Sequence, residues 1–200
     1  PGYYTRVNQQ TGIDIKERLM SRETGSGTLC LGRVRVSELY TGYRRLIDEK
    51  IISTESLSLE PITFETVSVW IEFSDKGMSA LPSGCDVGGS LHGAEHALIA
   101  MMPYHVLCDR WDLGGLSSAS SAQVKGRAVI FIYDGYEGGI GLSERAYNVY
   151  EELCQSAEKM VRECRCKDGC PACIYSPKCG NDNQPLDKKG CIALLKHICG

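Results

Sequence analysis

The amino-acid sequence predicts an α+β fold, in which a mainly antiparallel β region is followed by a helix-rich region that contains one buried strand. Apolar and polar residues alternate over much of the first third of the chain, as they do in half-buried strands. Helical spacing of apolar residues begins near residue 91, and five of the eleven cysteines lie between 164 and 179. The chain therefore divides into a β-rich accessory region (1–75), a Gly/Ser/Pro-containing linker (76–89) and a helical domain with a four-cysteine site (90–200).

The β region is predicted from stretches with a two-residue period. Leu29–Val36 alternates apolar with basic residues, and Phe64–Phe73 separates two faces most clearly. Thr41–Ile47, together with Ile51 and Ile52, predicts a further strand or two around a turn. The stretch 11–27 holds helix-forming and polar residues and ends in Gly-Ser-Gly, which predicts a mobile hairpin tip.

The second region is predicted to hold the helices. A helix is expected from Leu91 to about Met102, where Pro103 ends or kinks it. The continuous apolar run 128–133 predicts a strand buried on both faces, and a glycine-rich loop after it opens a long helix to about Val161. A last helix is expected within 186–198, with apolar residues along one side.

Composition excludes some functional classes. A formal net charge of −3 argues against a generally basic nucleic-acid binder, although a local basic strip remains compatible with it. No run approaches the roughly 18 apolar residues of a membrane span, and no secretory signal is seen, which predicts a cytoplasmic protein. The chain opens with Pro1-Gly2 rather than Met, which suggests a piece of a longer protein. No P-loop motif is present, so we expect no ATP site of that kind.

The cysteine-rich stretch predicts a zinc-binding region. Cys170 and Cys173 form a C-x-x-C knuckle, a spacing that lets two thiolates reach one ion. Tetrahedral zinc needs two more ligands, which must come from Cys164, Cys166 and Cys179. Buried free thiols or disulfides are the alternative, but the crowding and the expected intracellular location favour one structural Zn²⁺ per chain.

Basic residues suggest a nucleic-acid surface. Arg33 and Arg35 share one predicted strand, and Arg44 and Arg45 lie near two tyrosines on the next. Cations beside aromatic rings suit single-stranded nucleic acid, whereas a solvated sheet face is the simpler interpretation. The residues to test for DNA binding are Arg33, Arg35, Arg44, Arg45, Lys167 and Lys178.

A second metal motif lies in the helix expected after residue 90. His92-Gly-Ala-Glu95-His96 matches H-x-x-E-H, the arrangement of inverted zinc metallopeptidases, and places two histidines one turn apart. A zinc-dependent hydrolase that uses these three residues is therefore an alternative function. Gly93 weakens the helix and no later motif marks a third ligand, which favours a structural pair of polar residues instead.

Several motifs together resemble one protein family. They are Glu95-His-Ala-Leu-Ile, Cys108-Asp-Arg-Trp-Asp-Leu-Gly-Gly-Leu-Ser, Tyr133-Asp-Gly-Tyr-Glu-Gly-Gly-Ile-Gly-Leu, and the cysteine stretch through Ser176-Pro-Lys-Cys-Gly-Asn and Leu186-Asp-Lys. Two earlier stretches, Val36 with Thr41-Gly-Tyr-Arg-Arg and Phe64-Glu-Thr-Val-Ser-Val-Trp, are similar to the segment that precedes this domain in the same family. This set is similar to the C-terminal zinc-binding (MZB) domain of MrfA-type superfamily-two ATP-dependent DNA helicases. The resemblance spans nearly the whole chain and is most specific in the cysteine stretch.

The resemblance implies an accessory domain with no enzymatic activity of its own. Upstream RecA-like motor domains would use ATP to move 3′ to 5′ on DNA during repair, and this domain would assist DNA binding or organise the motor. The family's metal ligands carry over to Cys166, Cys170, Cys173 and Cys179, with Cys164 as an alternative ligand. The implied partner is DNA, in single-stranded form. A protein-interaction platform is a further alternative.

Overall fold

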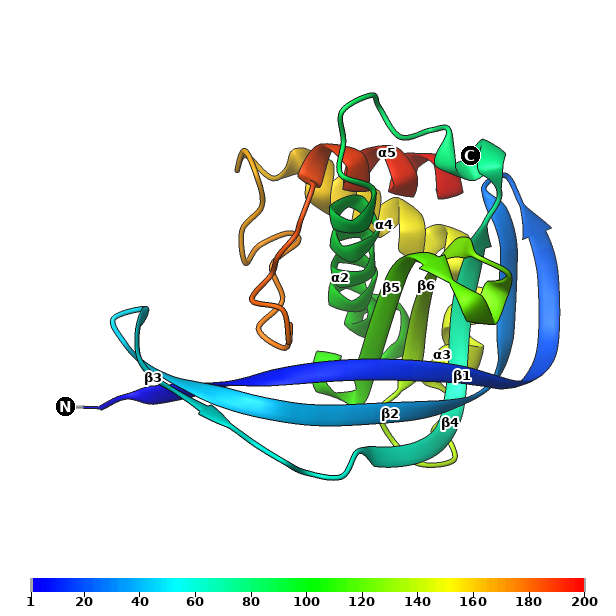
Figure 1. The fold of residues 1–200 in the computed structure, drawn as a ribbon. Coiled ribbons are helices and arrows are strands. Elements are labelled where there is room, and N and C mark those ends of the chain that lie inside the picture. The colour runs from blue at the N-terminus through cyan, green and yellow to red at the C-terminus, as the bar shows by residue number, and fades with distance from the viewer. Residues whose placement is uncertain (1, 200) are drawn as a thin grey trace.

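A computed structural model describes residues 2–199, which form one antiparallel sheet and a layer of helices (Figure 1). The strands are β1 (Tyr4–Thr24), β2 (Gly27–Ile47), β3 (Lys50–Ser56), β4 (Ile62–Phe73), β5 (Leu113–Ser121) and β6 (Arg127–Asp134). The helices are α1 (Asp75–Met78), α2 (Val87–Val106), α3 (Leu142–Asn148), α4 (Tyr150–Glu163) and α5 (Lys188–Cys199), with short 3₁₀ turns η1 (Arg110–Asp112) and η2 (Ala122–Val124). These elements confirm the predicted α+β class.

The first two strands form a hairpin of 21 residues each, paired from Tyr4 with Leu46 to Thr24 with Gly27. The sequence did not predict β1, because its mostly polar composition hides the strand period. The hairpin tip is also packed rather than free, since Ser26 is fully buried and accepts a backbone hydrogen bond from Ser74. The opposite end, together with β3, extends past the helices; residues 4–10 and 40–56 are called the arm below (Figure 1).

The sheet has the order β1-β2-β4-β6-β5, and β3 also pairs with β2. The helical region thus contributes two strands where the sequence predicted one, because the Gly- and Ser-rich β5 carries too few apolar side chains to reveal a period. Pairing of β4 with β6 joins both predicted regions in one sheet. The sheet curls so that its two edge strands approach each other. The backbone N–H of Ile15 on β1 donates to Oε1 of Gln123, just after β5, at 3.1 Å.

Helices α2 to α5 lie where the sequence predicts helices, with different ends, whereas the short α1 lies mostly in the stretch predicted as a linker. Asp86 caps α2 by accepting from the Gly89 N–H, and the helix continues past Pro103 to Val106. The single helix expected to reach Val161 is divided into α3 and α4, because Val149 leaves helical geometry (φ −113°). Within the described residues, no helix is long and apolar enough to cross a membrane.

Two apolar clusters fill the two faces of the sheet. Val69 and Ile71 of β4 face the helices with Leu98 and Leu153, as their alternation predicts. Trp70 faces the opposite side, inside the curl of the sheet, where it packs with Phe131 at a ring distance of 5.7 Å. The helical layer therefore rests on one face and fixes the position of the loop after α4.

Within the curl lies a fully buried carboxylate, Glu72 of β4. It forms ion pairs with Arg18 and Arg127 and accepts a hydrogen bond from Nε1 of Trp70 at 3.0 Å. A buried charge is stable only when it is paired and hydrogen-bonded, and Glu72 meets both conditions.

Candidate metal centre

Four thiols converge directly after α4. Neighbouring sulfurs in this group are 3.4–3.8 Å apart, and all four lie within 4.8 Å of one another. Zinc holds thiolates in a tetrahedron at about 2.3 Å, which places the ligand sulfurs about 3.8 Å apart. The observed separations fit this geometry, so the group is suited to one zinc. This four-sulfur group consists of Cys164, Cys166, Cys170 and Cys173.

Local chain geometry explains why these thiols meet. Cys164 is the C-terminal cap of α4, so the helix fixes its position. The chain then turns at Gly169, which has φ +122° and approaches the Tyr175 ring too closely for a side chain. Past this turn, the N–H of Cys173 donates to the carbonyl of Cys170 at 2.9 Å and closes the knuckle. The resulting loop brings both thiols of the knuckle back to the end of α4.

Lys188, the first residue of α5, supplies positive charge to the sulfur group. Its Nζ donates to the carbonyls of Cys164 (2.7 Å) and Cys166 (2.6 Å) and to the Cys166 sulfur (3.2 Å). Burial acts to raise the pKa of Cys166, but hydrogen bonds from Cys173, Lys188 and the other thiols outweigh it and lower the pKa to about 6. Cys166 therefore favours the thiolate, which is the form that binds metal, whereas burial raises the pKa of Cys173.

The fourth cysteine differs from the one that the resemblance implied. Cys164, the alternative ligand, completes the group, whereas Cys179 lies outside it. The reason is Ile174, which is fully buried in the core and whose carbonyl is 2.8 Å from Nδ1 of His96. This contact carries the chain away from the sulfurs and along α2. Cys179 instead approaches Nε2 of His92 at 3.4 Å.

The resemblance included Lys188, but sequence reasoning gave this lysine no role at the metal centre. A signal was present, because a lysine opens a helix where the macrodipole disfavours a cation. Such a residue needs a compensating partner. The carbonyls and sulfur of the loop between α4 and α5 (residues 164–187, called the cysteine loop below) provide it.

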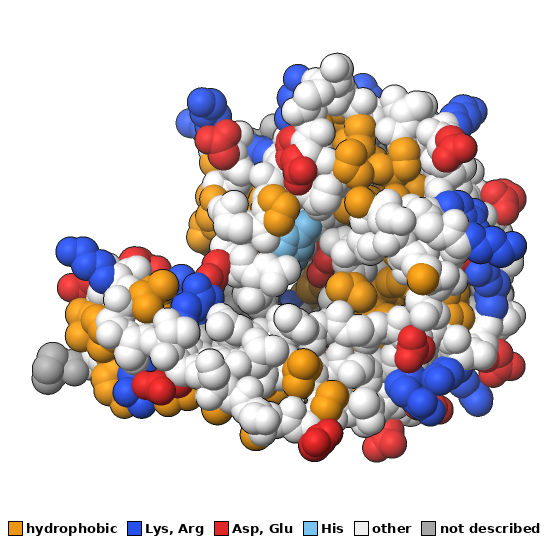
Figure 2. Space-filling view, in the orientation of Figure 1, with side chains coloured by type: hydrophobic (Ala, Val, Ile, Leu, Met, Phe, Trp, Pro, Cys, Tyr) orange, Lys and Arg blue, Asp and Glu red, His pale blue; other side chains and the backbone are white. Residues whose placement is uncertain are grey.

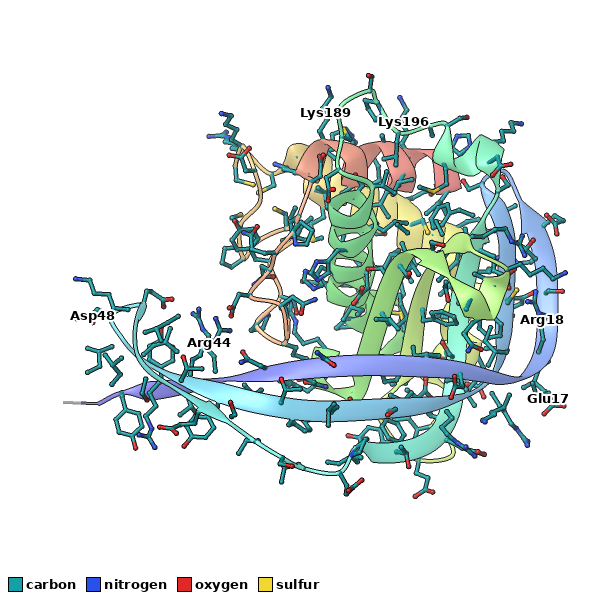
Figure 3. The ribbon with its side chains drawn as sticks, in the orientation of Figure 1. Glu17, Arg18, Arg44, Asp48, Lys189 and Lys196 are labelled. Atoms are coloured by element: carbon teal, nitrogen blue, oxygen red, sulfur yellow. The ribbon has the colours of Figure 1, made fainter. Side chains whose placement is uncertain are left out.

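The basic residues predicted to contact DNA fall into two classes. Arg44 is tied to Asp182 at 2.5 Å, and Figure 3 shows its side chain reaching from the arm toward the cysteine loop. Arg45 stacks on the rings of Tyr3 and Tyr43. Both cations are therefore engaged inside the molecule.

Lys178 is likewise engaged, since its Nζ donates to the Leu113 carbonyl at 2.6 Å and lies over the Trp111 ring; burial lowers its pKa. Arg35 pairs with Glu65 at 2.8 Å. Arg33 is 67% exposed with its nearest carboxylate 3.9 Å away, and Lys167 is exposed. Only the last two of the predicted residues thus present largely free side chains to solvent.

The chain is similar to known proteins in both sequence and structure. The family described as the MrfA Zn-binding domain matches residues 94–174, a range that contains the four-sulfur group and excludes Cys179. An uncharacterized protein of Methanocaldococcus jannaschii, MJ1572.1, is 42% identical over 54% of this chain and 98% of its own length.

Helicases are also similar to the chain. The uncharacterized ATP-dependent helicase YprA of Bacillus subtilis is 29% identical over 86% of the chain, and the ATP-dependent helicase HRQ1 of Saccharomyces cerevisiae is 26% identical over 97%. The chain spans only 23% and 19% of these two proteins.

Among solved structures, the DUF1998 helicase MrfA bound to DNA matches 98% of the chain with a TM-score of 0.67 and 25% identity, over 25% of its own length. The cysteine geometry, the family match over the sulfur group and the archaeal relative agree. This chain belongs to the family of the MrfA Zn-binding domain.

Proposed function

We propose that this chain is a zinc-stabilised accessory domain of an ATP-dependent DNA helicase, and that it contributes contacts to DNA. The observation that carries the proposal is the four-sulfur group, which fills every position of a tetrahedral zinc and leaves none for substrate. A centre of this kind organises a fold. The likeness to a DNA-bound helicase over almost the whole chain supports the DNA contact.

In this proposal the chain hydrolyses no ATP. RecA-like motor domains of the same protein would supply movement, and the zinc domain would hold DNA or orient the motor. Movement from 3′ to 5′, a role in DNA repair and preference for single strands belong to the proposal and rest on the resemblance. A cytoplasmic location is also proposed, supported by ten cysteines among the described residues that form no disulfide, since thiols persist in reducing compartments.

Fluorescence anisotropy of the chain with a labelled single strand of about 16 nucleotides tests the DNA contact. Affinity should fall between about 50 and about 200 mM salt, because each phosphate contact releases counterions. Alanine at Arg33 or at Lys167 should weaken binding and reduce the log–log salt slope by about 0.7. Alanine at Arg35, which is already paired with Glu65, is the matched control. Affinity that does not change with salt, or no binding at low salt, contradicts the DNA contact.

A protein-interaction platform is a second candidate, favoured by the arm. Ile51 and Ile52 of the arm are 55% and 53% exposed, and Leu59 and Ile62, in the segment that follows it, are 54% and 57% exposed, which leaves apolar surface without cover. The hydrolase alternative also stays a prediction. It requires Glu95 to act on a metal-bound water, although this carboxyl is buried, which raises its pKa, and it is hydrogen-bonded by Ser117.

A further inference from the structure

A second set of metal-ligating side chains lies apart from the four-sulfur group. His92 and His96 are one turn apart on α2, with ring centroids separated by 4.3 Å. Cys179 approaches them from the loop before α5, and ligand atoms of all three residues lie within 4.8 Å of one another. The H-x-x-E-H motif lacked a third ligand in the sequence, and the fold supplies one 83 residues further along the chain, at Cys179.

Both histidines are oriented as metal ligands. Nδ1 of His92 is 2.9 Å from the Pro185 carbonyl, and Nδ1 of His96 is 2.8 Å from the Ile174 carbonyl. A carbonyl oxygen only accepts, so each Nδ1 carries the proton and each Nε2 keeps a free lone pair. Histidine ligands of metals nearly always have such a partner behind the ring, which fixes the tautomer and the ring direction.

The loop around Cys179 holds its sulfur in place. Asn183 bridges the loop, because its side chain accepts from the Ser176 N–H at 2.7 Å and donates to the Ser176 carbonyl at 3.1 Å. The backbone N–H of Asn183 also donates to the Cys179 sulfur at 3.2 Å. This donor stabilises a thiolate, the form that a metal requires.

The spacing fits zinc. With bonds of about 2.0–2.1 Å to nitrogen and about 2.3 Å to sulfur, a tetrahedral ion places a nitrogen ligand and a sulfur ligand about 3.6 Å apart. Nε2 of His92 and the sulfur of Cys179 are 3.4 Å apart. We propose that His92, His96 and Cys179 bind a second Zn²⁺, through two imidazole nitrogens and one thiolate.

The proposed site opens onto a cavity of about 1000 Å³, which all three residues line. In the space-filling view, histidine surface appears in the hollow between the arm and the helical part (Figure 2). Three protein ligands leave the fourth position of a tetrahedral ion for water or another small ligand. The two metal centres would thus differ in kind, since one is closed by sulfur and the other is open to the cavity.

Zinc content and ligand type test this site in the chain itself, after incubation with Zn²⁺ and removal of excess ion. We expect two zinc per chain by elemental analysis, one in Cys179→Ser, one in His92→Ala and one in Cys170→Ser. X-ray absorption should show sulfur and nitrogen together in the unmodified chain. It should show sulfur alone in Cys179→Ser, where only the four-sulfur group remains loaded. His105→Ala and Cys85→Ser, which change residues outside both groups, should retain two zinc.

Circular dichroism separates loss of metal from loss of fold, and His92→Ala removes a half-exposed ring rather than a core residue. One zinc per unmodified chain overturns the proposal, as does a Cys179→Ser protein that keeps two. An all-sulfur environment in the unmodified chain overturns it as well. None of these results depends on whether the chain binds DNA, so the site stands or fails separately from the proposed function.

Discussion

The two ends of the molecule are held by different interactions. Around the four-sulfur group, α4 and α5 pack on an apolar core, and the buried Lys188 supplies positive charge beside the Cys166 sulfur. The arm instead depends on ion pairs such as Arg6–Glu49 and on arginines stacked over tyrosines. Its exposed apolar residues include Tyr4, Val7, Ile47, Ile51 and Ile52. Stability at the metal end should therefore depend on thiolates and zinc. Order in the arm should depend on ionic strength, because salt screens its exposed ion pairs.

The largest effect should come from breaking the four-sulfur group. Binding free energies of structural zinc are on the order of 10 kcal/mol, and much of that is folding free energy. Cys170→Ser should lose one zinc and raise hydrogen exchange across 164–179 and the start of α5, while exchange in the arm stays unchanged. Cys108→Ser, outside the group, is the control. Full metal content in Cys170→Ser would show that the ligands are misassigned.

A smaller but still large effect is expected at Glu72, which ties the curl of the sheet together. Replacing it by Gln leaves Arg18 and Arg127 without their shared carboxylate, and breaking a buried pair costs about 3–5 kcal/mol. Since both arginines are about 40% exposed, we expect a loss near about 3 kcal/mol in urea unfolding. Glu65→Gln, which breaks the exposed pair with Arg35, should cost less than about 1 kcal/mol. Equal losses would contradict the role given to burial.

The contact between the arm and the cysteine loop comes next. Arg44 is only 20% exposed where it meets Asp182, so Arg44→Ala should cost about 1 kcal/mol and speed exchange in both segments. Asp182→Asn should cost slightly more, because Arg6 also lies 3.9 Å from this carboxylate, and adding Arg44→Ala to Asp182→Asn should cost little, since their shared interaction is already lost. Arg45→Ala, whose partner Glu55 lies within the arm, should leave the loop unchanged. Additive losses in the double variant would mean that the pair does not join the two ends.

Sequence patterns predicted the parts of this fold that have a regular period. Alternation in Phe64–Phe73 gave both faces of β4 correctly, and the knuckle spacing identified a zinc loop. The long β1 was missed because its side chains are polar on both faces over much of its length. For such a strand, order comes from pairing with β2, which no local pattern encodes.

Local sequence patterns also did not determine which cysteines share the metal ion. Spacing left Cys164, Cys166 and Cys179 open for the remaining positions, and the resemblance implied the last two with Cys164 as alternative. The choice depends on where Ile174 finds its core contact, because this contact decides the direction of the chain after the knuckle. The chain that leaves this contact carries Cys179 to His92. The position of Ile174 thus separates the four-sulfur group from the set formed by His92, His96 and Cys179.

The smallest effect expected is the pH dependence of the pair that joins the hairpin to α4. Arg22 and Glu151 form a bidentate pair, and the hydrogen bond from Arg22 is the main reason that the pKa of Glu151 lies below its usual 4.5. A carboxylate with a lowered pKa stabilises the fold above its unfolded pKa and loses that contribution as pH falls through its folded pKa.

Solvent screens this pair, because its side chains are 36% and 42% exposed, so the contribution should be about 0.5 kcal/mol. A double-mutant cycle of Arg22→Gln and Glu151→Gln measures the coupling free energy of this pair. Zinc release at low pH affects all four proteins of the cycle alike and therefore cancels. The coupling should be constant from pH 7 to about pH 5 and should vanish below the folded pKa of Glu151. A coupling that grows on acidification would mean that the carboxylate is not the stabilised form of Glu151.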